Sequence, residues 1–185
     1  MDNKELIEKL KELGLCGEAI DWVKENNYDL NQVWENCHRG DWLIWLLVKT
    51  KSLTKKEEVA VALECAKTVQ HLMKDERSFD ALQACYNYVD GKISKEELRD
   101  AADAAYAVAV AADTADAAYA AAYAASAAST AAGAYADVAS YAAAATAASY
   151  AAAASYSVAA AERVQNQRKT ADIVRIMFAV EKIKI

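Results

Sequence analysis

The chain has 185 residues, a formal net charge of −6, four cysteines and no proline. This length suits one domain with one core, and the negative charge disfavours nucleic acid and anionic membrane as partners, because both are negatively charged. The cysteines are isolated, with no Cys-x-x-Cys pair, and no basic and then apolar leader follows Met1. We therefore expect a single all-helical cytoplasmic domain, residues 1–185, with reduced and buried thiols.

Residues 1–93 predict about six short amphipathic helices that pack together. Apolar side chains recur at helical spacing through residues 1–37, as expected for surface helices with one buried stripe. The apolar run from Trp42 to Val48 is interpreted as a buried helix capped by Asp41. Another buried helical face is predicted from Phe79, Leu82, Tyr86 and Val89.

Two helix starts are marked by capping boxes. Thr54 is followed three residues later by Glu57, and Ser94 by Glu97. In this motif the hydroxyl and the carboxylate each accept a hydrogen bond from a backbone N–H that the helix leaves without a partner. Helices are therefore expected to begin directly after Thr54 and Ser94.

An alanine- and tyrosine-rich tract dominates residues 94–165. More than half of the residues from 101 to 161 are alanine, and seven of the ten tyrosines of the chain lie there. Alanine is the strongest helix former, and one helix over this length would measure about 100 Å, too long for a domain of this size. We predict a helical hairpin that folds back near Gly133, with tyrosines supplying volume that alanine lacks. The uncharged stretch 138–161 is long enough to span a membrane, but alanine gains too little in lipid to favour that interpretation.

Residues 166–185 predict an amphipathic helix that closes the bundle. Its apolar positions recur at helical spacing and are Ile173, Ile176, Met177, Val180 and Ile183. The predicted fold class is therefore all-α, a compact multi-helix bundle with a long Ala/Tyr-rich hairpin.

The sequence lacks the common motifs of catalysis and of cofactor binding. It holds no Gly-rich phosphate loop, no His-Glu-x-x-His and no nucleophile elbow. Cys37 and His38 could begin a metal site or a catalytic dyad, but their spacings to the other cysteines and to His71 match no zinc signature. The sequence therefore favours a protein that is not an enzyme and that holds no metal or cofactor.

Tryptophan, arginine and aspartate gather between positions 34 and 45, and four of these residues are candidates for binding: Arg39, Asp41, Trp42 and Trp45. One interpretation is structural, in which Arg39 and Asp41 pin the helices around a tryptophan-rich core. In the other, the arginine and the indoles line a recognition surface, because these side chains dominate binding hot spots.

A basic cluster follows the tract, which itself contains no lysine or arginine between 101 and 161. The candidates there are Arg163, Gln167 and Arg168. They could bind an acidic partner or a phosphate-bearing ligand, or they could offset the dipole at the end of a helix.

Residues 37–46, Cys-His-Arg-Gly-Asp-Trp-Leu-Ile-Trp-Leu, resemble the Cys-x-Arg-x-Asp-Trp-x-x-Trp-Leu signature of an all-α family of immunity proteins. That family is the fifth immunity-protein type of bacterial polymorphic toxin systems and is also met in phage genomes. Features downstream are similar in order, namely Cys65-Ala66, Val89-Asp90-Gly91, the Ala-Ala-Asp-Ala-Ala-Tyr repeats and the closing helix with 171–174. The resemblance implies protection against a toxin or defence effector by direct binding, without catalysis.

Two hypotheses for function follow. In the first, the chain belongs to a bacterial or phage conflict system and neutralises a toxin or immune effector protein through an acidic or aromatic surface. In the second, it is a phage anti-defence sponge that sequesters a nucleotide immune signal with Arg39 or with the Arg163 and Arg168 cluster. A homo-oligomer is compatible with both hypotheses, and the sequence does not name the partner.

Overall fold

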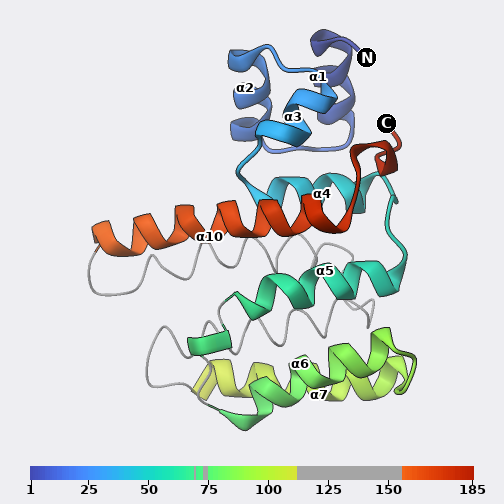
Figure 1. Ribbon diagram of the computed structural model, residues 1–185, viewed down its shortest axis with the longest axis vertical. Helices are drawn as coiled ribbons and strands as arrows, with labels where there is room; N and C mark the ends of the chain where they lie inside the picture. Colours follow the sequence, from blue (N-terminus) through green and yellow to red (C-terminus); the bar gives the residue numbers. More distant parts are fainter. Residues whose placement is uncertain (69, 73–74, 112–155) are drawn as a thin grey trace.

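The computed structural model describes residues 1–68, 70–72, 75–111 and 156–185 (Figure 1). These residues form α-helices and short 3-10 turns, and within them no strand occurs, which confirms the all-α prediction. The α-helices are α1 (Asn3–Glu12), α2 (Gly17–Asn26), α3 (Leu30–Asn36), α4 (Gly40–Lys49), α5 (Lys55–Lys67), α6 (Glu76–Val89), α7 (Lys95–Ala111) and α10 (Tyr156–Met177), and the 3-10 turns are η1 (Gln70–Leu72) and η3 (Val180–Lys182).

The helices are stacked in layers along the longest axis of the molecule, and this order differs from their order in the chain (Figure 1). The short helices α1, α2 and α3 cluster at one end, where both chain termini also lie. Next come α4 and α10, which pack on each other, then α5, and finally the pair α6 and α7. The six helices predicted before residue 93 are confirmed as α1 to α6.

Two clusters of buried side chains hold these layers together. The large-residue core lies among α1 to α4, α5 and α10, and the small-residue core lies among α5, α6 and α7. Leucine, isoleucine and valine dominate the first, whereas alanine is frequent in the second. The principal members of the large-residue core are Leu6, Leu10, Val23, Trp34, Leu43, Ile44, Leu47 and Val174, and those of the small-residue core are Val59, Ala62, Leu63, Ala66, Ala81, Leu82, Cys85, Leu98 and Ala102.

Helix α5 belongs to both cores because it is buried on two faces. Val61 and Cys65 pack into the large-residue core, while Val59, Leu63 and Ala66 pack into the small-residue core. A helix covered on both sides needs apolar residues around most of its circumference, in place of one stripe. It therefore joins the two halves of the molecule.

The helix starts agree with the sequence at two positions and differ at a third. Thr54 and Ser94 form the predicted capping boxes with Glu57 and Glu97. The prediction that Asp41 caps α4 is wrong, because the N-cap position is Arg39 and Asp41 lies inside the first turn. Its carboxylate binds the guanidinium of Arg39, a charged and therefore stronger donor than a backbone N–H.

Two predicted apolar faces are also corrected. Phe79 and Tyr86 are about two-fifths exposed, and the buried side of α6 carries Ser78, Ala81, Leu82 and Cys85. In the closing helix Ile176 is 85% exposed, whereas Ile173 and Met177 of the predicted stripe are partly buried. The helix also begins earlier than residue 166, at Tyr156, because no helix breaker separates the end of the tract from the closing segment.

Three of the four thiols are buried as predicted, whereas Cys16 is exposed at the N-cap of α2. The predicted turn at Gly133 lies outside the described residues, as do residues 138–155 of the uncharged stretch and most of the tract's tyrosines. Among the helices that the structure describes, none is long and apolar enough to cross a bilayer.

Candidate functional site

The candidate site begins where α4 and α10 touch. A Cβ atom on Gly40 would lie 2.3 Å from Oγ1 of Thr170 and 2.7 Å from the backbone nitrogen of Ala171. Only glycine allows the two backbones to approach so closely. This contact fixes the start of α4, and with it Arg39 and Trp42, against α10.

Arg39 and Asp41 form a bidentate ion pair at this point. Arg39 donates from Nε to Oδ1 of Asp41 at 2.9 Å and from Nη2 to Oδ2 at 2.6 Å. The Asp41 side chain is only 8% exposed and that of Arg39 19%, so the pair is largely removed from water. A third contact joins Nη1 of Arg39 to Oε1 of Glu18 on α2 at 3.3 Å. The hydrogen bonds that Asp41 accepts, together with the negative charges of Asp41 and Glu18, raise the pKa of Arg39 above its ordinary value.

Arg175 fastens α10 to the end of α3, a role that the sequence analysis did not predict. It donates from Nε to the carbonyl oxygen of Trp34 at 2.7 Å and from Nη2 to the carbonyl oxygen of Cys37. These carbonyls lie at the C-terminal end of α3, where the last carbonyl groups have no backbone N–H partner within the helix. The loop that carries His38 and Arg39 is thus held from both sides.

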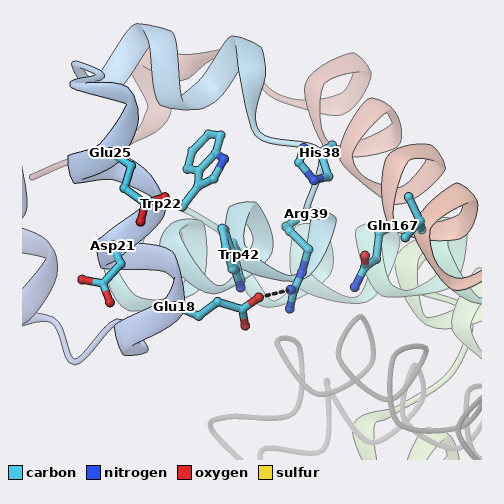
Figure 2. Close-up of a pocket in the computed structure, with 9 residues that line it drawn as sticks. Glu18, Asp21, Trp22, Glu25, His38, Arg39, Trp42 and Gln167 are labelled. Carbon is cyan, nitrogen blue, oxygen red and sulfur yellow. Dashed lines mark hydrogen bonds and ion pairs between the residues drawn. The ribbon is translucent and has the colours of Figure 1, made fainter. Parts of the chain in front are cut away.

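An open pocket of about 770 Å³ lies in front of this anchored corner. Figure 2 shows its lining residues, which come from α2, the α3–α4 connection, α4 and α10. A volume of this order is typical of sites that receive a small ligand or part of a peptide. The lining residues are Glu18, Asp21, Trp22, Glu25, His38, Arg39, Trp42, Val164 and Gln167.

Aromatic rings build one side of the pocket. The ring of Trp22 lies 6.0 Å from that of Trp42 at an angle of 60°, and its edge contacts with Tyr28 and His38 span 5.3 Å and 6.5 Å. The guanidinium carbon of Arg39 lies 4.5 Å from the centroid of the Trp42 ring. This distance is a cation–π contact, so the pocket already holds one guanidinium against an indole.

Among the described residues of the lining, acidic groups outnumber basic ones, with three carboxylates and one guanidinium. Arg39 is already engaged by Asp41 and Glu18. Asp21 makes a surface ion pair with Lys24 at 3.1 Å, whereas Glu25 forms no ion pair within the described part of the chain. The described part of the lining therefore presents excess negative charge beside two indoles.

Gln167 contributes a polar group from α10. The residue is only 7% exposed, yet its side chain lines the pocket and reaches toward Arg39 (Figure 2). Among the described residues no hydrogen bond is formed by its side-chain amide. Among the described residues the fully enclosed polar atoms without a partner are Oγ of Ser78 and Nδ2 of Asn166, so the Gln167 amide is open to the pocket and can bond a ligand there.

The sequence-predicted site residues are only partly brought together. Arg39, Trp42 and Gln167 line the pocket, and Asp41 lies behind it as the partner of Arg39. Trp45 instead packs against the large-residue core. Arg168 is exposed and does not line the pocket, and the side chain of Arg163 lies outside the described part of α10.

The contribution of α2 to the pocket was not predicted from the sequence. Glu18, Asp21, Trp22 and Glu25 are spaced three, four and seven residues apart, which places them on one face of a helix. That spacing, together with a tryptophan among carboxylates, was the signal for this wall of the pocket.

Metal binding and thiol chemistry find no support at this corner. In residues 1–68, 70–72, 75–111 and 156–185, no group of three or more His, Cys, Asp or Glu residues could hold a metal ion. Burial raises the pKa of the Cys37 thiol to about 11, so that it is protonated at neutral pH and is a poor nucleophile.

Comparisons of this chain with family models, with curated proteins and with solved structures found no match.

Proposed function

We propose that this chain is a non-enzymatic binding protein that neutralises a toxin or an immune effector protein of a bacterial or phage conflict system by direct contact. The resemblance of residues 37–46 to immunity proteins supports the proposal. The observation that carries it is the pocket, in which Trp22 and Trp42 lie beside three carboxylates on a rigid base of helices.

Such a surface suits recognition of a protein partner. Tryptophan is among the side chains that contribute most to interface energies, and carboxylates accelerate association with a basic partner. The pocket walls are fixed by the close approach at Gly40, by the Arg39–Asp41 pair and by Arg175. A preformed surface loses little conformational entropy when it binds.

A catalytic role is less well supported by the same residues. His38 is exposed, and its ring meets the ring of Trp22 at 6.5 Å. Within the described residues no hydrogen bond orients its imidazole. A catalytic histidine is normally held by a hydrogen-bonded partner within reach of the reacting group.

The pocket also weighs against sequestration of a nucleotide at this place. A nucleotide would bring phosphates toward Glu18, Asp21 and Glu25, and like charges repel. Arg39 would have to exchange its bond with buried Asp41 for a phosphate, leaving an unpaired carboxylate. The excess negative charge therefore favours a basic protein partner.

The test combines a growth assay in cells with binding and thermal-unfolding measurements on the purified chain. Proteins encoded beside its gene are expressed one at a time, with growth, size-exclusion chromatography with light scattering and thermal unfolding as readouts. We expect one of them to be toxic alone, to be relieved by this chain, and to form a stoichiometric complex that raises the Tm. In parallel, cyclic and ADP-ribose-type nucleotides should leave the Tm unchanged. A Tm rise with a nucleotide, and no complex with any encoded neighbour, would overturn the proposal.

A further inference from the structure

The pocket has a chemistry that selects one kind of partner side chain. We propose that it receives an arginine of the partner protein, with the guanidinium placed between Trp22 and the carboxylates of α2. This inference deepens the proposed function and rests on it. It concerns which group of the partner is recognised, and not whether a partner is bound.

Charge is the first argument. Glu18, Asp21 and Glu25 line one wall of the pocket, and the opposing guanidinium of Arg39 is already bound to Asp41. Glu25 also lies in the last turn of α2, where the partial negative charge of the helix end makes a carboxylate unfavourable. Glu18 and Asp21 already have ion-pair partners, so an incoming cation would chiefly pair with Glu25 and offset this local cost.

The aromatic wall is the second argument. A cation over the face of an indole is attracted by the ring quadrupole, and a planar guanidinium can also stack on it. Arg39 shows this geometry over Trp42 at 4.5 Å. Trp22 lies 6.0 Å from Trp42 in the same wall and remains partly exposed. An arginine from outside would find a second indole beside the one that Arg39 already uses.

Gln167 independently supplies a hydrogen-bond acceptor for the arginine. Its side chain is more than nine-tenths buried, lines the pocket, and makes no hydrogen bond among the described residues. Its amide oxygen can accept a hydrogen bond from an N–H donor. A guanidinium has five N–H donors in a fixed fork, enough to bind a carboxylate of α2 and this oxygen together.

Pocket size fits this occupant. About 770 Å³ is more than one side chain fills, so the neighbouring backbone of an extended segment can enter with the arginine. Val164 of α10 lines the same pocket and is 40% exposed, which offers an apolar contact to the methylene stem of the arginine.

The test uses the full chain labelled with nitrogen-15 and follows the indole N–H signals of its four tryptophans. Trp22→Phe and Trp42→Phe variants assign these signals. The probe is the blocked peptide acetyl-Gly-Arg-Gly-amide, and its control contains citrulline, which has the same shape without the charge. We expect saturable shifts of the Trp22 and Trp42 signals with the arginine peptide, at a dissociation constant on the order of a millimolar, and none with the citrulline peptide.

Variants then test whether the carboxylates of α2 are needed for peptide binding. Asp21 and Glu25 are exposed, so Asp21→Asn with Glu25→Gln should leave the fold intact and weaken peptide binding by about tenfold. The matched control is Glu8→Gln, which removes an exposed carboxylate on α1 away from the pocket and should bind like the parent chain. The inference is overturned by the absence of a saturable Trp22 or Trp42 shift, by equal shifts with citrulline, or by unchanged binding in the double variant.

The same double variant separates this inference from the proposed function. If the toxin or effector complex forms with unchanged affinity, recognition of an arginine in the pocket is wrong while the binding function stands. If no protein complex forms although the arginine peptide binds, the pocket chemistry stands and the proposed function is wrong.

Discussion

The start of α4 and the start of α6 each carry an arginine and an aspartate two residues apart, joined by two hydrogen bonds. In both pairs the Nε–Oδ1 distance is 2.9 Å, for Arg39 with Asp41 and for Arg77 with Asp75. Their surroundings differ, because the side chains are 19% and 8% exposed in the first pair but 51% and 35% in the second. Pairs of equal geometry can therefore contribute differently to stability, since burial determines how much unfolding free energy is lost when one partner is removed.

Removal of the arginine is expected to separate the two pairs most clearly. Arg39→Ala leaves Asp41 nearly buried without its partner, and we expect a loss of about 3 kcal/mol in the free energy of unfolding. Arg77→Ala leaves Asp75 in water and should not change stability measurably. Urea unfolding of both variants checks this, and similar losses for the two would contradict the role given to burial.

Two glycines near the site differ in the space that is available for an added Cβ atom. Gly40→Ala drives a methyl group into Thr170 and the backbone of Ala171, so α4 and α10 must separate at a cost of about 2 kcal/mol. Gly17→Ala meets nothing within 4 Å and should be neutral or stabilising by about 0.5 kcal/mol. Thermal unfolding measures both effects, and an unchanged Tm for Gly40→Ala would mean that the two helices are not held in close contact.

Arg175 and Arg168 allow a similar comparison on one helix. Arg175→Ala removes the donors to the carbonyls of Trp34 and Cys37, and we expect a loss of about 1.5 kcal/mol. Arg168→Ala should be silent because that side chain is exposed. Hydrogen exchange at the amides of α3 is the sharper readout, since it should accelerate in the first variant only. Equal exchange in both would contradict the anchoring of α3 by α10.

The smallest expected effect is a loss of stability at low pH, caused by the contact between α5 and the C-terminal turn η3. A hydrogen bond from Lys182, aided by the backbone N–H of Thr54, lowers the pKa of Glu57 from 4.5 to about 2. Between these values the unfolded chain binds a proton that the folded chain does not, so stability falls as pH falls through this window. Glu57→Gln and Lys182→Ala should each make that decline shallower in urea unfolding at pH 3 and pH 5. An unaltered slope in both variants would show that the contact does not contribute.

The sequence predicted features that depend on local chemistry. The capping boxes at Thr54 and Ser94 form because both partners lie within one turn. The six early helices could likewise be predicted, since each has its own apolar stripe and its own stop signal. The failed cap at Asp41 shows the limit of such reasoning, because a guanidinium two residues away competes for the carboxylate and wins.

The candidate site was only half predictable because its walls come from distant segments. Arg39, Trp42 and Gln167 were chosen as unusual residues, but their meeting depends on the contact of α4 with α10 at Gly40. Trp22 was missed since a single tryptophan in a short helix is more often part of a core. The role of Arg175 could not be foreseen, because its acceptors are backbone carbonyls 138 and 141 positions away in the sequence.

We expect the pocket to bind positively charged groups in preference to negatively charged ones. The most direct measurement is a parallel titration of the Trp22 indole N–H signal with acetyl-Gly-Arg-Gly-amide and with ADP-ribose, at equal ionic strength. We expect a saturable shift with the arginine peptide, and no shift with ADP-ribose, because the carboxylates of α2 repel its phosphates. Saturable binding of ADP-ribose, with no response to the arginine peptide, would contradict the claim.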